Sequence, residues 1–383
     1  MCQWRRELFK KIYQFAIKIQ YNFKMSDKFF ISRLTSEDFP QDSEIDISSG
    51  GGKILIVSDL HMGTGSRDDL FHNGDMLTSI LKERYFKNGW ILALNGDVEE
   101  LMRYPLDYIH EKWADLYRVF SLFNDAGRLY KIAGNHDEQL LSKKPASYPF
   151  AVHTAVKIKT AVIDAYVFHG HQLSSVYFKL NRIMGIFIRY VLAPFGIKNI
   201  SDARSPYKRF KIEKMAYAFS MENKCLSIIG HTHRPLFESL GRFDYIKFEI
   251  ERLCRDYPAS SGEERICIEN EVTALRGELG KLKRKERRDV LRQSLYGDEL
   301  PVPCLFNSGC TLGKQGFNAL EMTNEDIALI YWFTEGNSKK FITRGNYKID
   351  SIPQTPYRRA VLNHNRLDYI FARIKLLGKN GKI

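Results

Sequence analysis

Five polar motifs, each rich in Asp, Asn or His, are distributed along the first two thirds of the chain, and most follow an apolar run. The runs KILIV, WILAL, LYKIA, AYVF and LSIIG have the length and composition of buried strands. Because functional side chains gather at the carboxyl ends of strands in α/β sheets, we expect the motifs to meet along one sheet edge. The motifs are SDLH at 58–61, NGDVEE at 95–100, AGNHDE at 133–138, FHGH at 168–171 and GHTH at 230–233.

The side chains of these motifs are suited to binding metal ions. Asp59 and His61 lie two apart after a strand, where the alternation of an extended chain would point both the same way. The two carboxylate oxygens of Asp97 are enough to bridge two cations at the spacing of roughly 3.5 to 4 Å that two-metal phosphoryl chemistry uses. His231 and His233 would lie on one face of an extended GHTH turn. Oxygen and nitrogen ligands without thiolate favour Mn, Fe, Zn or Ni over Cu(I).

The order and wording of the motifs resemble the calcineurin-like metallophosphoesterases, whose pattern runs DxH, GDxx(D/E), GNH(D/E), H, GHxH. The resemblance covers about 54–235 and resumes near 303–333. It implies an α/β fold, a four-layered α/β/β/α sandwich with helical insertions. It also implies two divalent metal ions, with Mn expected first and Fe, Zn or Ni as alternatives. One ion would take Asp59, His61, Asp97 and His233, and the other Asp97, Asn135, His169 and His231.

The same resemblance implies a catalytic mechanism in which a hydroxide held between the metals attacks phosphorus. His136 would protonate the leaving oxygen, and Glu100 would accept a hydrogen bond from His136 and fix its tautomer. Asp137 is the weaker candidate for that orienting role. Two further side chains are candidates for substrate binding. His171 either contacts phosphate or supports the turn, and Arg67 either neutralises phosphate or is a solvated loop arginine.

The implied activity is hydrolysis of a phosphate ester or pyrophosphate bond in a phosphorylated small-molecule or lipid-like substrate. The GHTHRP and GDVEE wording is similar to the UDP-diacylglucosamine pyrophosphatase branch, although that branch has GNRD where this chain has GNHD. Three alternatives share the fold: a metal-dependent nuclease, a protein phosphatase, and a noncatalytic binding scaffold. Nucleic acid is the less favoured partner because the chain between its two basic ends is neutral overall, which does not indicate a basic groove.

Both ends of the chain are basic and amphipathic. Residues 1–24 and 334–383 together account for the whole net charge of +13. Such helices suit an anionic membrane surface, or they pack on the core with solvated basic faces. Scattered cysteines, which suggest reduced thiols, predict a cytoplasmic protein, and the basic ends extend that prediction to peripheral attachment at the inner face of the membrane. Met25 is an alternative start of translation.

The insertions and ends complete the predicted organisation. Spacing of four and three residues between Ile268, Val272, Leu275, Leu279 and Leu282 predicts a helical hairpin, or a dimer contact through 266–288. Six cysteines without CxxC pairing predict reduced thiols. The predicted units are a basic N-terminal segment and linker (1–50), a catalytic core (51–235) with a helical lid insertion (172–225), the hairpin insertion (236–302), closing strands of the core (303–333) and a basic C-terminal extension (334–383). The insertion 172–225 either covers the active site as a lid or packs on the core as a helical subdomain.

Overall fold

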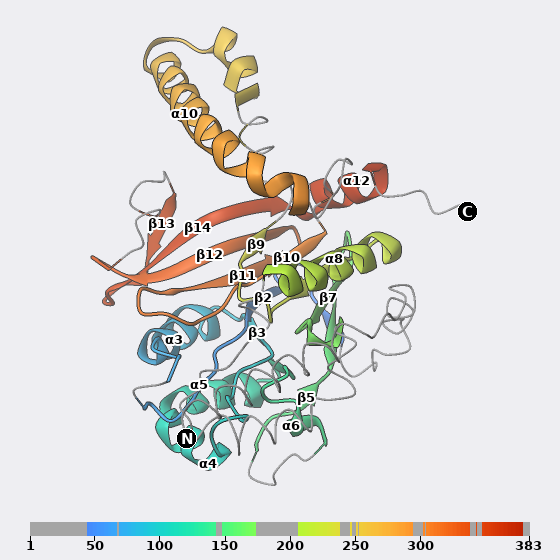
Figure 1. Ribbon diagram of the computed structural model, residues 1–383. Coiled ribbons are helices and arrows are strands. Elements are labelled where there is room, and N and C mark those ends of the chain that lie inside the picture. The colour runs from blue at the N-terminus through green and yellow to red at the C-terminus, as the bar shows by residue number, and fades with distance from the viewer. Residues whose placement is uncertain are drawn as a thin grey trace, which may run out of the picture.

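Two β-sheets pack face to face between outer helices in the computed structural model of the protein (Figure 1). This arrangement confirms the α/β fold class and the four-layered α/β/β/α sandwich predicted from the sequence. The structure describes residues 44–66, 69–142, 148–173, 206–237, 246, 250–251, 253–293, 302, 304–337, 342 and 347–377.

The larger sheet has eight strands in the order β13-β14-β12-β11-β2-β3-β4-β5. Its parallel half is formed by β2 (Lys53–Val57), β3 (Ile91–Asn95), β4 (Leu129–Ile132) and β5 (Val152–His153). Its antiparallel half is formed by β11 (Phe317–Thr323), β12 (Asp326–Thr334), β13 (Lys348–Ser351) and β14 (Tyr357–Arg366). The predicted strands before the first three motifs are therefore β2, β3 and β4.

The smaller sheet has six strands in the order β1-β6-β7-β8-β10-β9. They are β1 (Glu44–Asp46), β6 (Ala155–Lys159), β7 (Ala165–Phe168), β8 (Leu226–Ile229), β9 (Leu236–Phe237) and β10 (Leu305–Asn307). The predicted strands before the last two motifs, β7 and β8, run parallel to each other in this sheet. The expectation of a single sheet edge was thus wrong, because the motifs come from strand ends in both sheets.

Alternate side chains of the central strands point into different cores. In β2, Ile54 and Ile56 pack between the two sheets, whereas Leu55 and Val57 pack against helices on the outer face. Since helices cover that outer face, every position of the strand after Lys53 is buried, which accounts for the uninterrupted apolar run ILIV. The covering elements are α3 (Gly74–Ile80), the π-helix η3 (Leu81–Phe86) and α5 (Ala114–Asp125).

The outer face of the smaller sheet is covered by α8 (Pro206–Asn223). Its residues Ile212, Ala216 and Phe219 are buried against that sheet. This part of the predicted lid is therefore a layer of the sandwich, because its apolar face is used for packing on the sheet. The rest of the predicted lid, from 174 to 205, lies outside the described residues.

The hairpin insertion contains the helix α10 (Gly262–Gln293), which projects from the sandwich (Figure 1). Ile268 is buried, and Val272, Leu275 and Leu279 are half-buried. The predicted dimer contact through 266–288 stays a prediction. The remaining short helices are α4 (Leu106–Lys112), α6 (Gln139–Ser142), η4 (His171–Leu173) and η8 (Tyr257–Ala259).

The predicted C-terminal extension belongs in large part to the sandwich. β14 pairs with β12 along its whole length, and the final helix α12 (Leu367–Leu377) buries Leu367, Ile370 and Ile374 in the core between the sheets. The core therefore continues past the predicted boundary at 333, because the apolar face of α12 is covered by protein. Residues 1–43 lie outside the described part of the chain, so membrane attachment stays a prediction.

Among the described residues, no helix combines the length and the apolar composition needed to span a bilayer. No disulfide joins Cys225, Cys254, Cys267, Cys304 or Cys310 to another described residue, and reduced thiols stay a prediction.

The packing of α12 can be tested with a matched pair of substitutions. Ile370→Ala should lower the free energy of unfolding by about 2 to 5 kcal/mol, because it removes a fully buried side chain and leaves a cavity. Leu376→Ala, on the same helix but 77% exposed, should change it by less than about 0.5 kcal/mol. Urea denaturation measures both values. Equal small effects would contradict the packing of α12 on the core.

Candidate metal centre

Hydrogen bonds between the motif loops bring the predicted ligands together at one end of the sandwich. After β2 and β3, the Asp59 and His61 amides donate to the carbonyls of Gly96 and Asp97, at 3.1 and 2.8 Å. After β7 and β8, the Gly230 amide donates to the His169 carbonyl at 3.0 Å. Side chains from motifs far apart in sequence therefore converge because their backbones are hydrogen bonded to one another.

Five of the seven predicted ligands have a left-handed backbone conformation, with φ between +20° and +160°. That conformation is unfavourable by roughly 1 to 2 kcal/mol for a residue with a Cβ, and its occurrence at five ligands indicates a shape imposed by the surrounding structure. The extended alternation expected for the SDLH and GHTH motifs was wrong, because these residues turn the chain sharply. They are Asp59 (φ 55°), His61 (φ 47°), Asp97 (φ 51°), His231 (φ 61°) and His233 (φ 54°).

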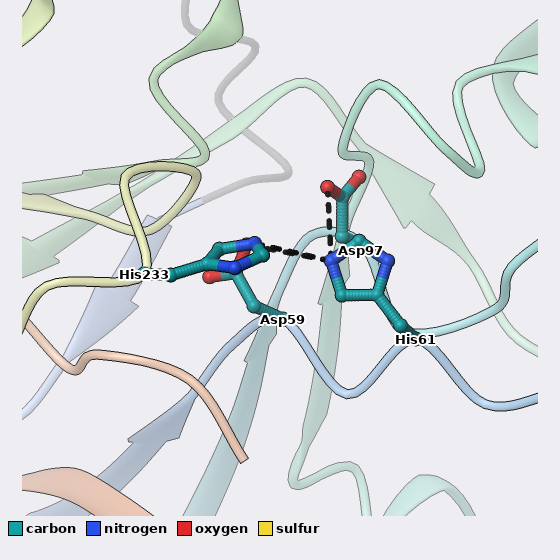
Figure 2. A group of neighbouring side chains, drawn as sticks. All are labelled: Asp59, His61, Asp97 and His233. Atoms are coloured by element: carbon teal, nitrogen blue, oxygen red, sulfur yellow. Dashed lines mark hydrogen bonds and ion pairs between the residues drawn. The ribbon is translucent and has the colours of Figure 1, made fainter. Parts of the chain in front are cut away.

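The first group of ligands consists of Asp59, His61, Asp97 and His233, whose ligand atoms all lie within 4.8 Å of one another (Figure 2). His233 Nε2 lies 3.1 Å from Asp59 Oδ1 and 3.2 Å from His61 Nε2. His61 Nε2 lies 3.7 Å from Asp97 Oδ2. Two carboxylates and two imidazoles in this arrangement could hold a divalent metal ion.

The second group consists of Asp97, His169 and His231. Asn135, which was predicted to join them, lies on the loop after β4. His169 Nδ1 donates to the Asn95 carbonyl at 2.9 Å, which leaves Nε2 to face Asp97 Oδ2 at 3.1 Å. The Asn135 amide oxygen is buried and has no hydrogen-bond partner among the described residues. A cation would satisfy this oxygen. Asp97, His169 and His231 offer three further ligand atoms within 4.8 Å of one another, so they also fit a metal ion.

Asp97 belongs to both groups, and its two oxygens have different contacts. Oδ1 accepts a hydrogen bond from the His136 amide at 2.8 Å. Oδ2 faces His61, His136 and His169, at 3.7, 3.9 and 3.1 Å. Burial alone would raise the pKa of Asp97, but these histidines, His169 foremost, hold it well below its usual range. The carboxylate therefore stays ionised and presents Oδ2 to both groups.

Glu100 contacts two histidines at this junction. Its Oε1 lies 2.7 Å from His136 Nδ1, the predicted contact, and its Oε2 lies 2.9 Å from His61 Nδ1, a contact not anticipated from the sequence. Burial acts against ionisation, yet His136 and His61 lower the pKa of Glu100 to about 2. Because ionised Glu100 can only accept, both histidines carry a proton on Nδ1, and both Nε2 atoms face the junction.

The pKa of His136 is governed by the same carboxylates. Burial lowers it, but Glu100 and Asp97 raise it to about 10. Cations held by the neighbouring groups would oppose that rise by electrostatic repulsion. Asp137, the alternative orienter, does not contact the His136 ring in this way, because its carboxylate pairs with Lys131.

Of the two residues predicted to bind substrate, His171 belongs to the described part of the chain and Arg67 does not. His171 is buried, and the centroid of its ring lies 5.4 Å from that of His169 and 6.4 Å from that of His231. His171 therefore adjoins the second group of ligands, and its role toward phosphate stays a prediction. Arg67 lies outside the described residues.

A sixth polar segment, NSGCT, begins at the last residue of β10, supports the site and was missed in the sequence. Asn307 donates to the Gly230 carbonyl and to Thr232 Oγ1, both at 2.9 Å. Ser308 Oγ lies 2.9 Å from Ser58 Oγ, next to the first ligand. The sequence does contain a signal for this segment, because a polar stretch follows the apolar residues of β10, as it does in the five motifs.

Comparisons with known proteins add little to this geometry. No protein-family model matches the chain, and no curated protein matches it. A solved structure of a Vps29 single mutant from Entamoeba histolytica is similar with a TM-score of 0.31 and 9% sequence identity, over 75% of this chain and 94% of that chain.

Asp97→Ala should strongly reduce the bound metal, because Asp97 Oδ2 is shared by both groups of ligands. The metal content after loading with Mn and desalting can be measured by plasma mass spectrometry. Asp107→Ala, at an exposed carboxylate on α4, is the matched control and should keep the wild-type metal content. Wild-type metal content in Asp97→Ala would contradict the shared-ligand geometry.

Proposed function

We propose that the protein is a dinuclear-metal phosphoesterase that hydrolyses a phosphate ester or pyrophosphate bond. The observation that carries this proposal is the pair of ligand groups sharing Asp97, with the buried His136 ring at their junction. Shared carboxylates of this kind hold two cations close enough to act on one phosphoryl group. The resemblance of the five motifs to calcineurin-like metallophosphoesterases supports the same reaction class.

The proposed metal ions are Mn, with Fe, Zn or Ni as alternatives. Asp59, His61, Asp97 and His233 would hold one ion, and Asp97, Asn135, His169 and His231 the other. When bound, the ions would supply Lewis acidity toward phosphoryl oxygens and lower the pKa of a water molecule.

His136 is proposed to move the proton that the leaving group needs. Its Nδ1 is engaged by Glu100, so the proton available to a substrate is on Nε2, which lies 3.9 Å from Asp97 Oδ2. Donation from Nε2 to the leaving oxygen avoids the release of an unstable alkoxide. Glu100 holds the ring in the required tautomer, and its second oxygen orients the ligand His61.

A substrate would approach from the side of His233. The His233 side chain is 20% exposed, whereas the other six predicted ligands are buried. We propose a phosphorylated small molecule or a lipid-like, nucleotide-linked phosphate as the substrate class. A noncatalytic scaffold is the less favoured alternative, since such a scaffold has no need for seven intact ligands and a positioned His136.

His136→Ala should lower kcat by about 10² to 10⁴ for esters with poor leaving groups, because protonation of the leaving oxygen is lost. The loss should shrink for nitrophenyl esters, whose leaving group is stable as an anion. His364→Ala, at an exposed histidine on β14, is the control and should retain wild-type rates. Equal losses for good and poor leaving groups would assign His136 to substrate positioning.

The reaction class itself is tested by a hydrolysis screen of the Mn-loaded protein against phosphomonoesters, phosphodiesters and pyrophosphates, including nucleotide-linked lipids. We expect turnover of at least one class, removed by chelation and absent from Asp97→Ala. A protein that binds Mn but hydrolyses none of them, nor a phosphoprotein or nucleic acid, would be a binding scaffold.

A further inference from the structure

The two consecutive glutamates of the GDVEE motif face opposite sides of their loop. Glu100 points to the metal centre, where it contacts His61 and His136. Glu99 points into the core, where its Oε1 accepts hydrogen bonds from Tyr117 at 2.8 Å and Tyr148 at 2.9 Å. Glu99 is 1% exposed and has no role in the proposed reaction, so its burial calls for a separate explanation.

A single buried cation lies between Glu99 and the GNHD loop. Lys131, in β4, is 0% exposed, and its ammonium group lies 3.1 Å from Glu99 Oε2 and also pairs with Asp137 Oδ2. Asp137 is likewise 0% exposed. One ammonium therefore pairs with carboxylates from two different motifs.

Asp137 also links the loop after β3 to the loop after β4 through hydrogen bonds. Its Oδ2 accepts a hydrogen bond from the Val98 amide at 2.8 Å, and its Oδ1 accepts one from the Gly134 amide at 2.6 Å. In return, the His136 amide donates to Asp97 Oδ1. The loops approach so closely that a Cβ on Gly134 would lie 2.2 Å from the Asp97 amide nitrogen.

The ion pair and these hydrogen bonds set the relative positions of the groups that the proposed reaction uses. One loop carries Asp97 and Glu100, and the other carries Asn135 and His136. Charged groups taken out of water are favourable only when they are well paired, so loss of Lys131 would leave two buried carboxylates repelling each other. The repulsion would act directly on the loops that carry the four residues.

We propose that Lys131 is a positioning residue, which holds Asn135 and His136 against Asp97 by pairing with both Asp137 and Glu99. The part of this proposal that concerns His136 rests on the phosphoesterase function, whereas the part that concerns Asn135 requires only metal binding. Lys131 touches neither the predicted ligands nor the reacting atoms, so its effect passes through Asp137.

The experiment compares Lys131→Met, the double variant Lys131→Met/Glu99→Gln and the control Tyr148→Phe, all in the full chain. The double variant removes one positive and one negative charge, so the net charge of the buried cluster stays as in the wild type. Tyr148→Phe removes a hydrogen bond to Glu99 without changing any charge. For each variant, we would measure the melting temperature, the binding of Mn, and kcat and KM for nitrophenyl and phenyl phosphate esters.

A positioning role predicts that the folded Lys131 variants bind the weaker of two Mn ions about 10-fold less tightly, the effect typical of losing support behind a ligand. It also predicts that kcat for the phenyl ester falls more than kcat for the nitrophenyl ester, with KM little changed, because the placement of His136 is affected. Tyr148→Phe should lower the melting temperature and leave both the Mn affinity and the ratio of rates unchanged.

Different results would contradict the positioning role of Lys131 and the phosphoesterase function. A folded double variant with wild-type Mn affinity and a wild-type ratio of rates would overturn the positioning role, as would the unfolding of both Lys131 variants, which would make Lys131 a structural residue only. Absence of ester hydrolysis in the wild type would overturn the phosphoesterase proposal. The Mn measurements would then still decide whether Lys131 positions Asn135.

Discussion

The carboxylate of Asp97 is the contact on which the rest of the site depends. One oxygen accepts the His136 amide and thereby joins the loop after β3 to the loop after β4. The other oxygen faces three histidines from three separate motifs. A carboxylate is suited to both tasks because its two oxygens accept in different directions while sharing one charge. If Asp97 is displaced, both groups of ligands lose their common member at once.

This geometry requires backbone conformations that the residues do not prefer. Five ligands have positive φ, and Gly96, directly before Asp97, has a φ of 80°. The unfavourable conformations are offset by hydrogen bonds between loops and by the rigid strands on which the loops stand. Strain of this kind is typical of functional sites, because a relaxed extended chain would send Asp59 and His61 elsewhere. The buried ion pair of Lys131 and Asp137 is a second interaction that supports the same loops.

Much of the fold was predictable because its strands are buried on both faces. The apolar runs of β2 and β3 have no other plausible location than the interior of a covered sheet. The assignment of strands to two sheets was not predictable, since buried strands of either sheet have the same composition. The same ambiguity affected α8 and α12, because apolar residues of a helix have the same composition whether they cover a substrate, a membrane or a sheet.

The sequence by itself determined the residue types of the candidate metal centre and the strand ends that carry them. When Asp, Asn and His occur at the ends of apolar runs in five motifs together, few roles other than metal binding account for them. Only the tertiary structure decided how these side chains are shared: which oxygen of Asp97 faces the ligands, that Glu100 contacts two histidines, and that Glu99 turns toward Lys131. The physical reason is that neighbouring residues in a loop separate according to burial and charge pairing, and their partners lie on strands far away in the chain.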